Sequence, residues 1–334
     1  MVTSRDVAKL AGVSQATISR AMSSSSKITP KTKALVQAAA DSLGYVPHAA
    51  AQAMRTKKTK TIGVVVADVT NPFYPEVLDE LTRELDAASY RVVIWNAGGE
   101  SHFDALNAIR RHAVDGVILT TATDDSVELH AALERDSLIV LINRLVEGLE
   151  CDQVASDNRG GGAAVADYFI QEGKTSVAFI GGATNASTSR DRGLGFINRM
   201  AELGYPVPTE LQFQADFSHD LSFEVMTKLI AGGKTPEAVF CANDYMAFGA
   251  LDALHHHGLI AARDCWVIGY DDVDMASWAS FDLTTVRQPS REMARIGARM
   301  LLDRIDSPDS PVQVVKFPFE LIVRGSTGGR FARS

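Results

Sequence analysis

Residues Thr3–Met22 read TSRDVAKLAGVSQATISRAM, and this pattern predicts two short helices joined by a tight turn. The first N–H groups of a helix have no backbone partner, and Ser, Thr, Asp or Asn side chains can accept from them. Thr3 and Asp6 form a T-x-x-D capping box at the start of the first helix. Gly12 ends that helix, because glycine enters the left-handed conformation without steric cost, and Ser14 can cap the second.

The second helix is expected to have two different faces. It directs Ile18, Ala21 and Met22 inward. The residues that face outward are Gln15, Ala16, Ser19 and Arg20. A helix whose N-terminal end exposes Gln and Arg can read base edges in the major groove of DNA. These residues alone leave open an ordinary helical hairpin that binds no nucleic acid.

Positive charge is concentrated in the first 60 residues. They contain ten Lys and Arg against only Asp6 and Asp41, a net charge of +8. Because the whole chain carries −8, the remainder carries −16. This division indicates that one end of the chain binds a polyanion, and nucleic acid is the expected one, since neutralising phosphates releases counterions. The alternative is a basic extension that only aids solubility, and the apolar periodicity within the segment argues against it.

A third helix is expected after a polar loop. Thr29 can cap it, Pro30 suits its first position and Gly44 ends it. Three helices in about 45 residues make a small module. Its predicted core consists of Val7, Leu10, Ile18, Met22, Leu35, Val36 and Leu43.

The segment after this module has the composition of a conditional linker. Pro47 can open a short fourth helix over Ala49–Met54, and the basic stretch Arg55–Lys60 follows. A helix of about six residues is unstable alone in water. We therefore expect it to be helical only when it packs on something.

From Thr61 onward, apolar β-branched runs alternate with longer amphipathic stretches. The predicted strands are 62–67, 91–96, 116–120, 138–142, 176–180, 237–241 and 265–269. The predicted helices are 75–89, 101–112, 126–135, 160–172, 191–203, 219–231, 245–257 and 290–304. This alternation is typical of parallel sheets covered by helices on both faces. We expect an α/β body of two doubly wound halves that meet near Ser156–Gly162, with a ligand cleft between them.

Polar and aromatic side chains follow several of the predicted strands, where such a cleft would lie. The sites that we expect to contact a ligand are Phe73, Tyr74, Arg144, Arg190, Arg192, Phe217, Asn243 and Asp271. Aromatic faces suit the apolar face of a sugar or a base, although Phe73 and Tyr74 could equally pack under the next helix. Asp244 and Asp272 are expected only to cap helices.

Several classes of protein are not indicated. No apolar run approaches the ~20 residues that cross a bilayer, and no export signal is seen at the N-terminus. Cys151, Cys241 and Cys265 fit neither a disulfide framework nor a zinc site, which favours the reducing cytoplasm. No catalytic nucleophile motif, metal site or dinucleotide loop is found, so no enzyme activity and no cofactor are expected.

In combination and in this order, eight motifs resemble the LacI/GalR family of bacterial transcription regulators. They are DVAKLAGVSQATISRAM, GYVPHAAAQAM, NPFY, SDNRGGG, RGLGF, CANDYMAFGA, VIGYDD and LTTVRQP. The resemblance covers the whole chain. It implies a helix-turn-helix headpiece over 1–46, and a hinge helix and linker over 47–60. It also implies a core like the periplasmic sugar-binding proteins, with an N-subdomain (61–157 and 287–318) and a C-subdomain (158–286 and 319–330).

The same resemblance implies roles for individual residues. Gln15, Ala16 and Arg20 match base-reading positions, and Thr17 and Ser19 match phosphate contacts. Met54 stands where the family usually has a leucine that wedges into the minor groove. Thr3, Ser14 and Ala51 complete the expected DNA contacts. In the core, Arg192, Asn243 and Asp271 match effector contacts, and Phe73, Tyr74 and Phe217 match stacking positions.

The function that follows is a repressor whose affinity for a pseudo-palindromic operator is controlled by a small effector, a sugar or a related polyol. A homodimer is expected, because family tetramers carry a leucine-heptad tail and this chain ends at GRFARS. Arg144 and Arg190 raise the hypothesis of an acidic or phosphorylated sugar. The alternative functions are a sugar-binding protein of a transport system and an enzyme of the doubly wound class.

Overall fold

The computed structural model describes residues 2–22, 28–45, 58–97, 107–108, 111, 113–123, 126, 129, 132–133 and 137–329. The contacts divide the chain into two compact units, residues 1–60 and 61–334. The helix predicted over 49–54, with Ala51 and Met54, lies outside the described residues, as do most of the helices predicted over 101–112 and 126–135.

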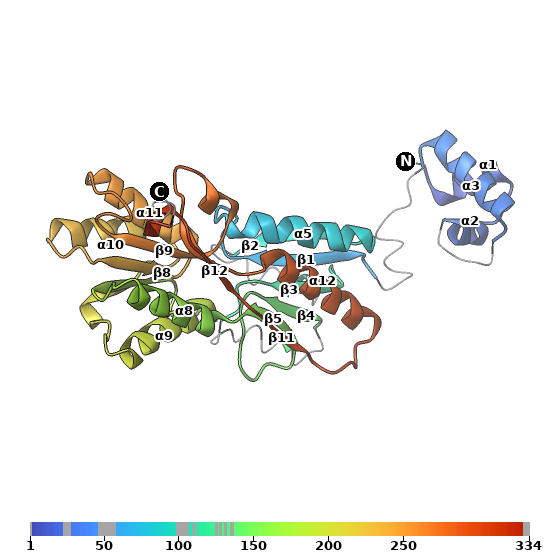
Figure 1. Cartoon of the computed structure of the whole chain (residues 1–334). Coiled ribbons are helices and arrows are strands. Elements are labelled where there is room, and N and C mark those ends of the chain that lie inside the picture. Colours follow the sequence, from blue (N-terminus) through green and yellow to red (C-terminus); the bar gives the residue numbers. More distant parts are fainter. Residues whose placement is uncertain are drawn as a thin grey trace. The chain divides into compact units, whose positions relative to one another are not determined.

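The first unit contains three helices, α1 (Ser4–Ala11), α2 (Gln15–Ala21) and α3 (Pro30–Leu43) (Figure 1). The Asp6 carboxylate accepts hydrogen bonds of 2.8 Å from both the backbone N–H and the hydroxyl of Thr3. Gly12 ends α1 in the left-handed conformation, with φ of 63°. The Ser14 hydroxyl accepts from the backbone N–H of Thr17 and thereby caps α2. The start and the end predicted for the first helix and the start of the second are confirmed.

The core of this unit is built largely from small residues. Val7, Ile18 and Val36 are buried together with alanines of all three helices. The prediction that Leu10 and Leu35 belong to this core is wrong, since their exposed fractions are 56% and 50%. On α1 the buried stripe runs through positions 7, 8 and 11, and on α3 it runs through 36, 39 and 40. At 100° per residue, each leucine lies on the flank of its stripe.

The second unit contains two sheets, each with six strands among the described residues. In the first sheet the strand order is β11-β5-β4-β3-β1-β2, and all pairs are parallel. Its strands are β1 (Thr61–Val66), β2 (Arg91–Asn96), β3 (Gly116–Leu119), β4 (Ile139–Ile142), β5 (Asp152–Ser156) and β11 (Val314–Phe317). The buried strands β1, β3 and β4 are the continuous apolar runs that the sequence predicts.

The second sheet has the order β12-β10-β9-β8-β6-β7 and is parallel except at β12, which pairs antiparallel with β10. Its strands are β6 (Val177–Gly181), β7 (Gln212–Gln214), β8 (Ala238–Cys241), β9 (Trp266–Asp271), β10 (Thr284–Arg287) and β12 (Glu320–Ile322). The α/β architecture of two mostly parallel sheets is therefore confirmed.

Helices pack on both sheets. On the first sheet, α5 (Phe73–Ala87) packs beside α12 (Ser290–Asp306) (Figure 1). The second sheet lies between the pair α8 (Asn158–Gln171) and α9 (Ser187–Glu202) and the pair α10 (His219–Ala231) and α11 (Asp244–His256). Short 3-10 helices occupy Thr209–Leu211, Asp274–Ser277 and Gly325–Thr327. No helix in the described part of the chain is both long and apolar enough to span a membrane.

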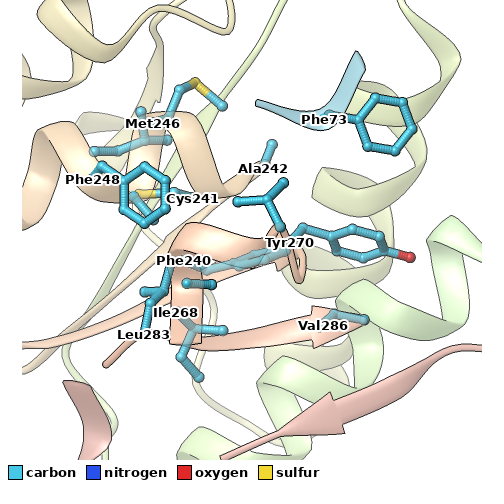
Figure 2. Close-up of a cluster of buried hydrophobic side chains, with 14 of the residues drawn as sticks. Phe73, Phe240, Cys241, Ala242, Met246, Phe248, Ile268, Tyr270, Leu283 and Val286 are labelled. Carbon is cyan, nitrogen blue, oxygen red and sulfur yellow. The ribbon is translucent and has the colours of Figure 1, made fainter. Parts of the chain in front are cut away.

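The chain crosses between the two sheets at three places. It leaves β5 for α8, β10 for α12, and β11 for β12. Two of these crossings touch, because the Asp157 N–H donates to the Phe317 carbonyl at 2.8 Å. The apolar core continues up to this region, where Tyr270 and Phe73 lie at one end of the buried cluster (Figure 2). The crossings thus bring polar residues of both sheets close to one another.

Candidate functional site

A cavity of about 370 Å³ lies where the carboxyl ends of the strands of both sheets meet. The lining residues follow β1, β4, β6, β7 and β8, and Asp271 is the last residue of β9. They include Asn71, Phe73, Tyr74, Asn143, Arg144, Thr188, Arg192, Asp216, Phe217, His219, Asn243, Tyr245 and Asp271. Seven of the eight residues predicted to contact a ligand are in this set. Its position is the one expected for ligand sites in doubly wound sheets.

Arg192 and Asp271 form a buried ion pair in the cavity, with Nη1 and Oδ1 3.2 Å apart and exposed side-chain fractions of 2% and 6%. The Arg192 guanidinium also donates from Nε to Asn158 Oδ1 at 2.8 Å and from Nη1 to the Ala242 carbonyl at 2.6 Å. It stacks over the Tyr270 ring, 3.7 Å from its centre. Its Nη2 has no hydrogen-bond partner among the described residues. A buried donor without a partner favours a ligand that would accept from it.

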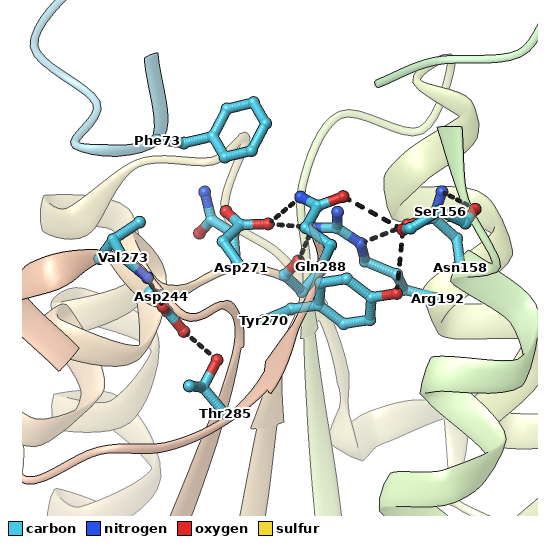
Figure 3. Close-up of polar contacts among 12 residues, drawn as sticks. Phe73, Ser156, Asn158, Arg192, Asp244, Tyr270, Asp271, Val273, Thr285 and Gln288 are labelled. Carbon is cyan, nitrogen blue, oxygen red and sulfur yellow. Dashed lines mark hydrogen bonds and ion pairs between the residues drawn. The ribbon is translucent and has the colours of Figure 1, made fainter. Parts of the chain in front are cut away.

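Asp271 connects this ion pair to the crossings between the sheets. Gln288 Nε2 donates to Asp271 Oδ1 at 2.7 Å, and the Ser156 hydroxyl donates to Gln288 Oε1 at 3.1 Å (Figure 3). The Tyr270 hydroxyl lies 3.4 Å from the same Ser156 oxygen. Ser156 precedes the first crossing and Gln288 lies within the second. Hydrogen bonds therefore join the cavity to the segments about which the two halves would move.

Burial raises the pKa of the Asp271 carboxyl to about 6, although Arg192 and the hydrogen bond from Gln288 act in the opposite direction. Burial also raises the pKa of Asp244 well above its ordinary value, and the charge of Asp271 adds to this effect. Asp271 is consequently the buried carboxylate of the cavity whose charge changes near neutral pH.

Arg144 lies on the first-sheet side of the cavity and is 7% exposed. Its Nη1 donates to the Thr121 carbonyl at 2.9 Å, and its guanidinium lies 5.9 Å from the centre of the Phe217 ring. Burial lowers the pKa of Arg144, and the nearby Arg192 lowers it further, whereas Tyr74 and Asp216 oppose this change. Among the described residues, no carboxylate lies within 4.0 Å of this guanidinium, and its Nε has no partner.

The aromatic residues are held by local structure. Asn71 Oδ1 accepts from the Phe73 N–H at 3.0 Å and so supports the first turn of α5. The Phe73 and Tyr74 rings pack edge to face, 5.4 Å apart, and are only 4% and 5% exposed. Phe217 is half-buried and packs so closely on Gly182 that a side chain there would overlap its ring. The Phe73 and Tyr74 rings therefore pack in the core and also line the cavity, and their contact with a ligand stays a prediction.

Backbone strain gathers at the cavity. Four of its lining residues have positive φ although none is glycine: Asn143 (75°), Asp216 (46°), Phe217 (57°) and Asp271 (124°). Each such residue costs about 1–3 kcal/mol and persists only where the surrounding structure holds it. The strain is consistent with side chains positioned for a ligand.

The predictions for helix capping at two aspartates are wrong. Asn243, and not Asp244, caps α11, since its Oδ1 accepts from the Met246 N–H at 2.9 Å. Asp244 instead accepts from the Thr285 hydroxyl at 2.5 Å and from the Val273 N–H at 2.9 Å. Asp272 caps no helix and pairs with Arg324 at 2.6 Å. Both aspartates thus stabilise the end of the second sheet behind the cavity.

Arg190 is not among the residues that line the cavity. Its Nε lies 3.3 Å from Asp191 Oδ1. On α9 the lining residues are Thr188 and Arg192, which are four positions apart and share one face, whereas Arg190 lies about 200° around the helix from Thr188. The structure therefore gives no support to the prediction for Arg190. Thr188 and His219 line the cavity but were not predicted from the sequence.

The exposed surface of α2 agrees with the predicted division of its faces. Gln15, Ala16 and Arg20 are exposed, Ser19 and Thr17 are half-buried, and Ile18 is buried. Gln15 Nε2 donates to the Ser4 hydroxyl at 2.9 Å, which ties the start of α2 to α1. Thr3 and Ser14, at the N-terminal ends of the two helices, are also exposed. The N-terminal ends of α1 and α2 are thus joined by a hydrogen bond, and Gln15 and Arg20 of α2 are exposed.

The comparisons with known proteins match both units of the chain. Residues 3–48 match the profile described as bacterial regulatory proteins, lacI family, and residues 166–327 match a periplasmic binding protein-like domain. The chain is 32% identical over 330 residues to the HTH-type transcriptional repressor PurR of Vibrio parahaemolyticus, with 98% of each chain covered. The chain belongs to the lacI family of bacterial regulatory proteins. It is a DNA-binding transcriptional regulator with a ligand-binding core, and not an enzyme.

Solved structures of this lacI family share the fold over nearly the whole chain. A complex of the transcriptional regulator CelR with cellobiose is 28% identical, with a TM-score of 0.74 and coverage of 98% of this chain and 100% of that one. A lac repressor dimer bound to operator and the anti-inducer ONPF has a TM-score of 0.84 at 24% identity, with 98% and 99% covered. The latter likeness concerns the fold alone.

Proposed function

We propose that this lacI-family protein is a cytoplasmic homodimeric repressor that binds a pseudo-palindromic operator and changes its DNA affinity when a small polyhydroxylated effector fills the cavity. The observation that carries the proposal is the buried Arg192–Asp271 pair, which lines a cavity between two sheets. Asp271 can accept from ligand hydroxyls, Arg192 and Asn243 can donate, and the rings of Phe73, Tyr74 and Phe217 can cover an apolar face. The cellobiose complex of CelR supports a sugar-like effector.

The DNA contacts in this proposal come from the first unit. Gln15 and Arg20 would read base edges, while Ala16 is too short to hydrogen-bond a base and could contact a thymine methyl group. Thr17 and Ser19 would contact phosphates together with Thr3 and Ser14, since N-terminal helix ends attract anions. Ala51 and Met54 would contact the minor groove from the hinge.

We assign residues 1–46 to the headpiece and 47–60 to the hinge. The N-subdomain would comprise 61–157 and 287–318, and the C-subdomain 158–286 and 319–330. Strand membership supports this division, since β11 joins the first sheet and β12 the second. Effector contacts would come from both subdomains, so binding would favour one relative arrangement of the two and shift the operator affinity through the hinge.

A gel shift with DNA from upstream of the protein's own gene tests the proposal. We expect sequence-selective binding that weakens steeply as salt rises, because phosphate contacts release counterions. Binding that is absent, or equal for all sequences, would contradict it. The alternative of a transport sugar-binding protein does not account for the lacI-family match over residues 3–48.

A further inference from the structure

The buried charges of the cavity do not balance. Two buried guanidiniums, those of Arg144 and Arg192, line it together with one buried carboxylate, that of Asp271. Asp271 is paired with Arg192 at 3.2 Å, so Arg144 is left without a carboxylate among the described residues. A buried cation without a counter-charge is costly, since its hydration is lost and nothing replaces it.

Only one of the three nitrogens of the Arg144 guanidinium has a hydrogen-bond acceptor among the described residues. Its Nη1 donates to the carbonyls of Thr121 and Ala122, at 2.9 and 3.4 Å. Its Nε is buried without a partner, and no described residue accepts from its Nη2. On the opposite side of the cavity, Arg192 Nη2 is also buried without a partner. Both guanidiniums at the cavity therefore have unused hydrogen-bond donors, and the two arginines come from different halves of the core.

The remaining carboxylates at the cavity do not cancel this excess. Asp68, Asp216 and Asp220 line it but are exposed to water. Asp68 accepts from the Thr70 hydroxyl, and Asp220 lies 2.9 Å from His219 Nδ1. Charges screened by water interact far more weakly than charges in a buried site. Asp216 acts on Arg144 only through space, since it forms no ion pair with it among the described residues.

From this imbalance we propose that the effector is a small sugar acid whose carboxylate pairs with Arg144 while its hydroxyls meet Asp271, Arg192 and Asn243. The proposal rests on the proposed function and narrows its ligand class. A guanidinium binds a carboxylate through two parallel hydrogen bonds, which Nε and Nη2 of Arg144 can supply together. The ligand would bring the one negative charge that the buried residues lack.

The charge count favours a carboxylate over a phosphate. A phosphate group carries about −1.5 to −2 at pH 7 and has three acceptor oxygens. Among the described residues that line the cavity, Arg144 is the one buried cation without a carboxylate partner, because Arg192 is already paired with Asp271. Arg190, a second cation that could serve a phosphate, does not line the cavity. A singly charged group therefore matches the site better.

Isothermal titration of the full-length protein tests this inference. The probes are D-glucuronate, D-galacturonate and D-gluconate, each against its neutral counterpart D-glucose or D-galactose, with glucose 6-phosphate as the phosphate arm. We expect at least one sugar acid to bind at least ~10-fold more tightly than its neutral counterpart and than the phosphate. No binding by any acid, equal binding of a neutral sugar, or tighter binding of the phosphate would overturn it.

Two variants make the test specific to Arg144. We expect R144Q to weaken binding of the sugar acid by ~10-fold or more and so to remove its advantage over the neutral counterpart. R190Q, which removes a nearby arginine outside the cavity, should leave the affinity unchanged. An unchanged affinity in R144Q would refute the assignment. If the wild-type protein binds a sugar acid but gives no gel shift with upstream DNA, that result would contradict only the proposed DNA-binding function.

Discussion

Asp271 combines burial, charge and backbone strain in one residue. It is the last residue of β9, its φ is 124°, and its carboxylate contacts both Arg192 and Gln288. The sequence predicts Asp271 as a ligand contact, since it follows an apolar strand. It does not predict Gln288, because the two meet only through the parallel register that pairs Arg287 with Asp271. A partner 17 positions away, just beyond the end of β10, leaves no local pattern.

The pH dependence of stability should report on Asp271. Its pKa rises from an ordinary 3.8 to about 6 in the folded protein, so the folded state keeps a proton that the unfolded chain has released. Its contribution to the free energy of unfolding is thus fully present below pH ~4 and is lost as the pH rises through 6. Relative to Asp271→Asn, the wild type should lose about 1 kcal/mol between pH 5 and pH 8. Urea unfolding at matched pH measures this, and parallel profiles for the two proteins would exclude the assignment.

At the scale of elements, the position of Arg192 depends on how closely α8 and α9 approach. A methyl group at Gly162 of α8 would overlap the Arg192 carbonyl, and one at Gly195 of α9 would overlap the Arg159 carbonyl. The run GGG at 160–162 lacks the context of a phosphate-binding loop, and the structure gives Gly162 a packing role instead. The sequence excludes a phosphate-binding role for this run but does not predict its packing role. The packing contact involves a second helix about 30 residues away, which the pattern of one helix does not reveal.

Gly162→Ala should therefore disturb both stability and the cavity. The added methyl group must push the two helices apart, which typically costs about 1–3 kcal/mol, and α9 would carry Arg192 away from Asp271. We expect a lower midpoint of thermal unfolding and weaker effector binding. Gly232→Ala is the matched control, since its φ is −79° and the nearest atom to a methyl group there is 3.2 Å away. A Gly162→Ala protein as stable as this control would refute the packing role.

The strands that the sequence failed to predict share physical features. They are β5, β7, β10, β11 and β12, all of three to five residues. β10 is buried although it contains two polar threonines, because the Thr284 and Thr285 hydroxyls form hydrogen bonds with Thr327 and Asp244. β5 begins at Asp152, which is buried by its pair with Arg304 at 2.8 Å. Apolar periodicity detects strands that are buried by hydrophobic side chains, and it misses strands whose polar residues find partners far away in sequence.

For the whole molecule, the division of charge separates two tasks. Residues 1–60 carry +8 and the rest −16, so attraction to DNA is confined to the first unit and the body does not compete for phosphates. The two-unit organisation was predictable because composition changes at Thr61 and apolar runs begin there. The charge balance of the cavity was not predictable from the sequence, since it depends on which arginines are buried and which carboxylates face water.

If DNA reading and effector sensing reside in separate units, variants in each should fail in opposite ways. Arg20→Ala removes a side chain of the exposed α2 face, so the protein should lose selectivity for its upstream DNA but keep effector affinity. Asp271→Ala removes the cavity's buried carboxylate, so DNA should remain bound while the effector no longer changes that affinity. In the wild type the effector should change the DNA affinity ~5–150-fold, as expected for a coupling of ~1–3 kcal/mol.

Titration of labelled upstream DNA, with and without the sugar acid that binds best, measures the DNA affinity of the wild type and of both variants. Normal selectivity in Arg20→Ala would remove α2 as the reading helix, and an unaltered effector response in Asp271→Ala would remove the cavity as the sensing site.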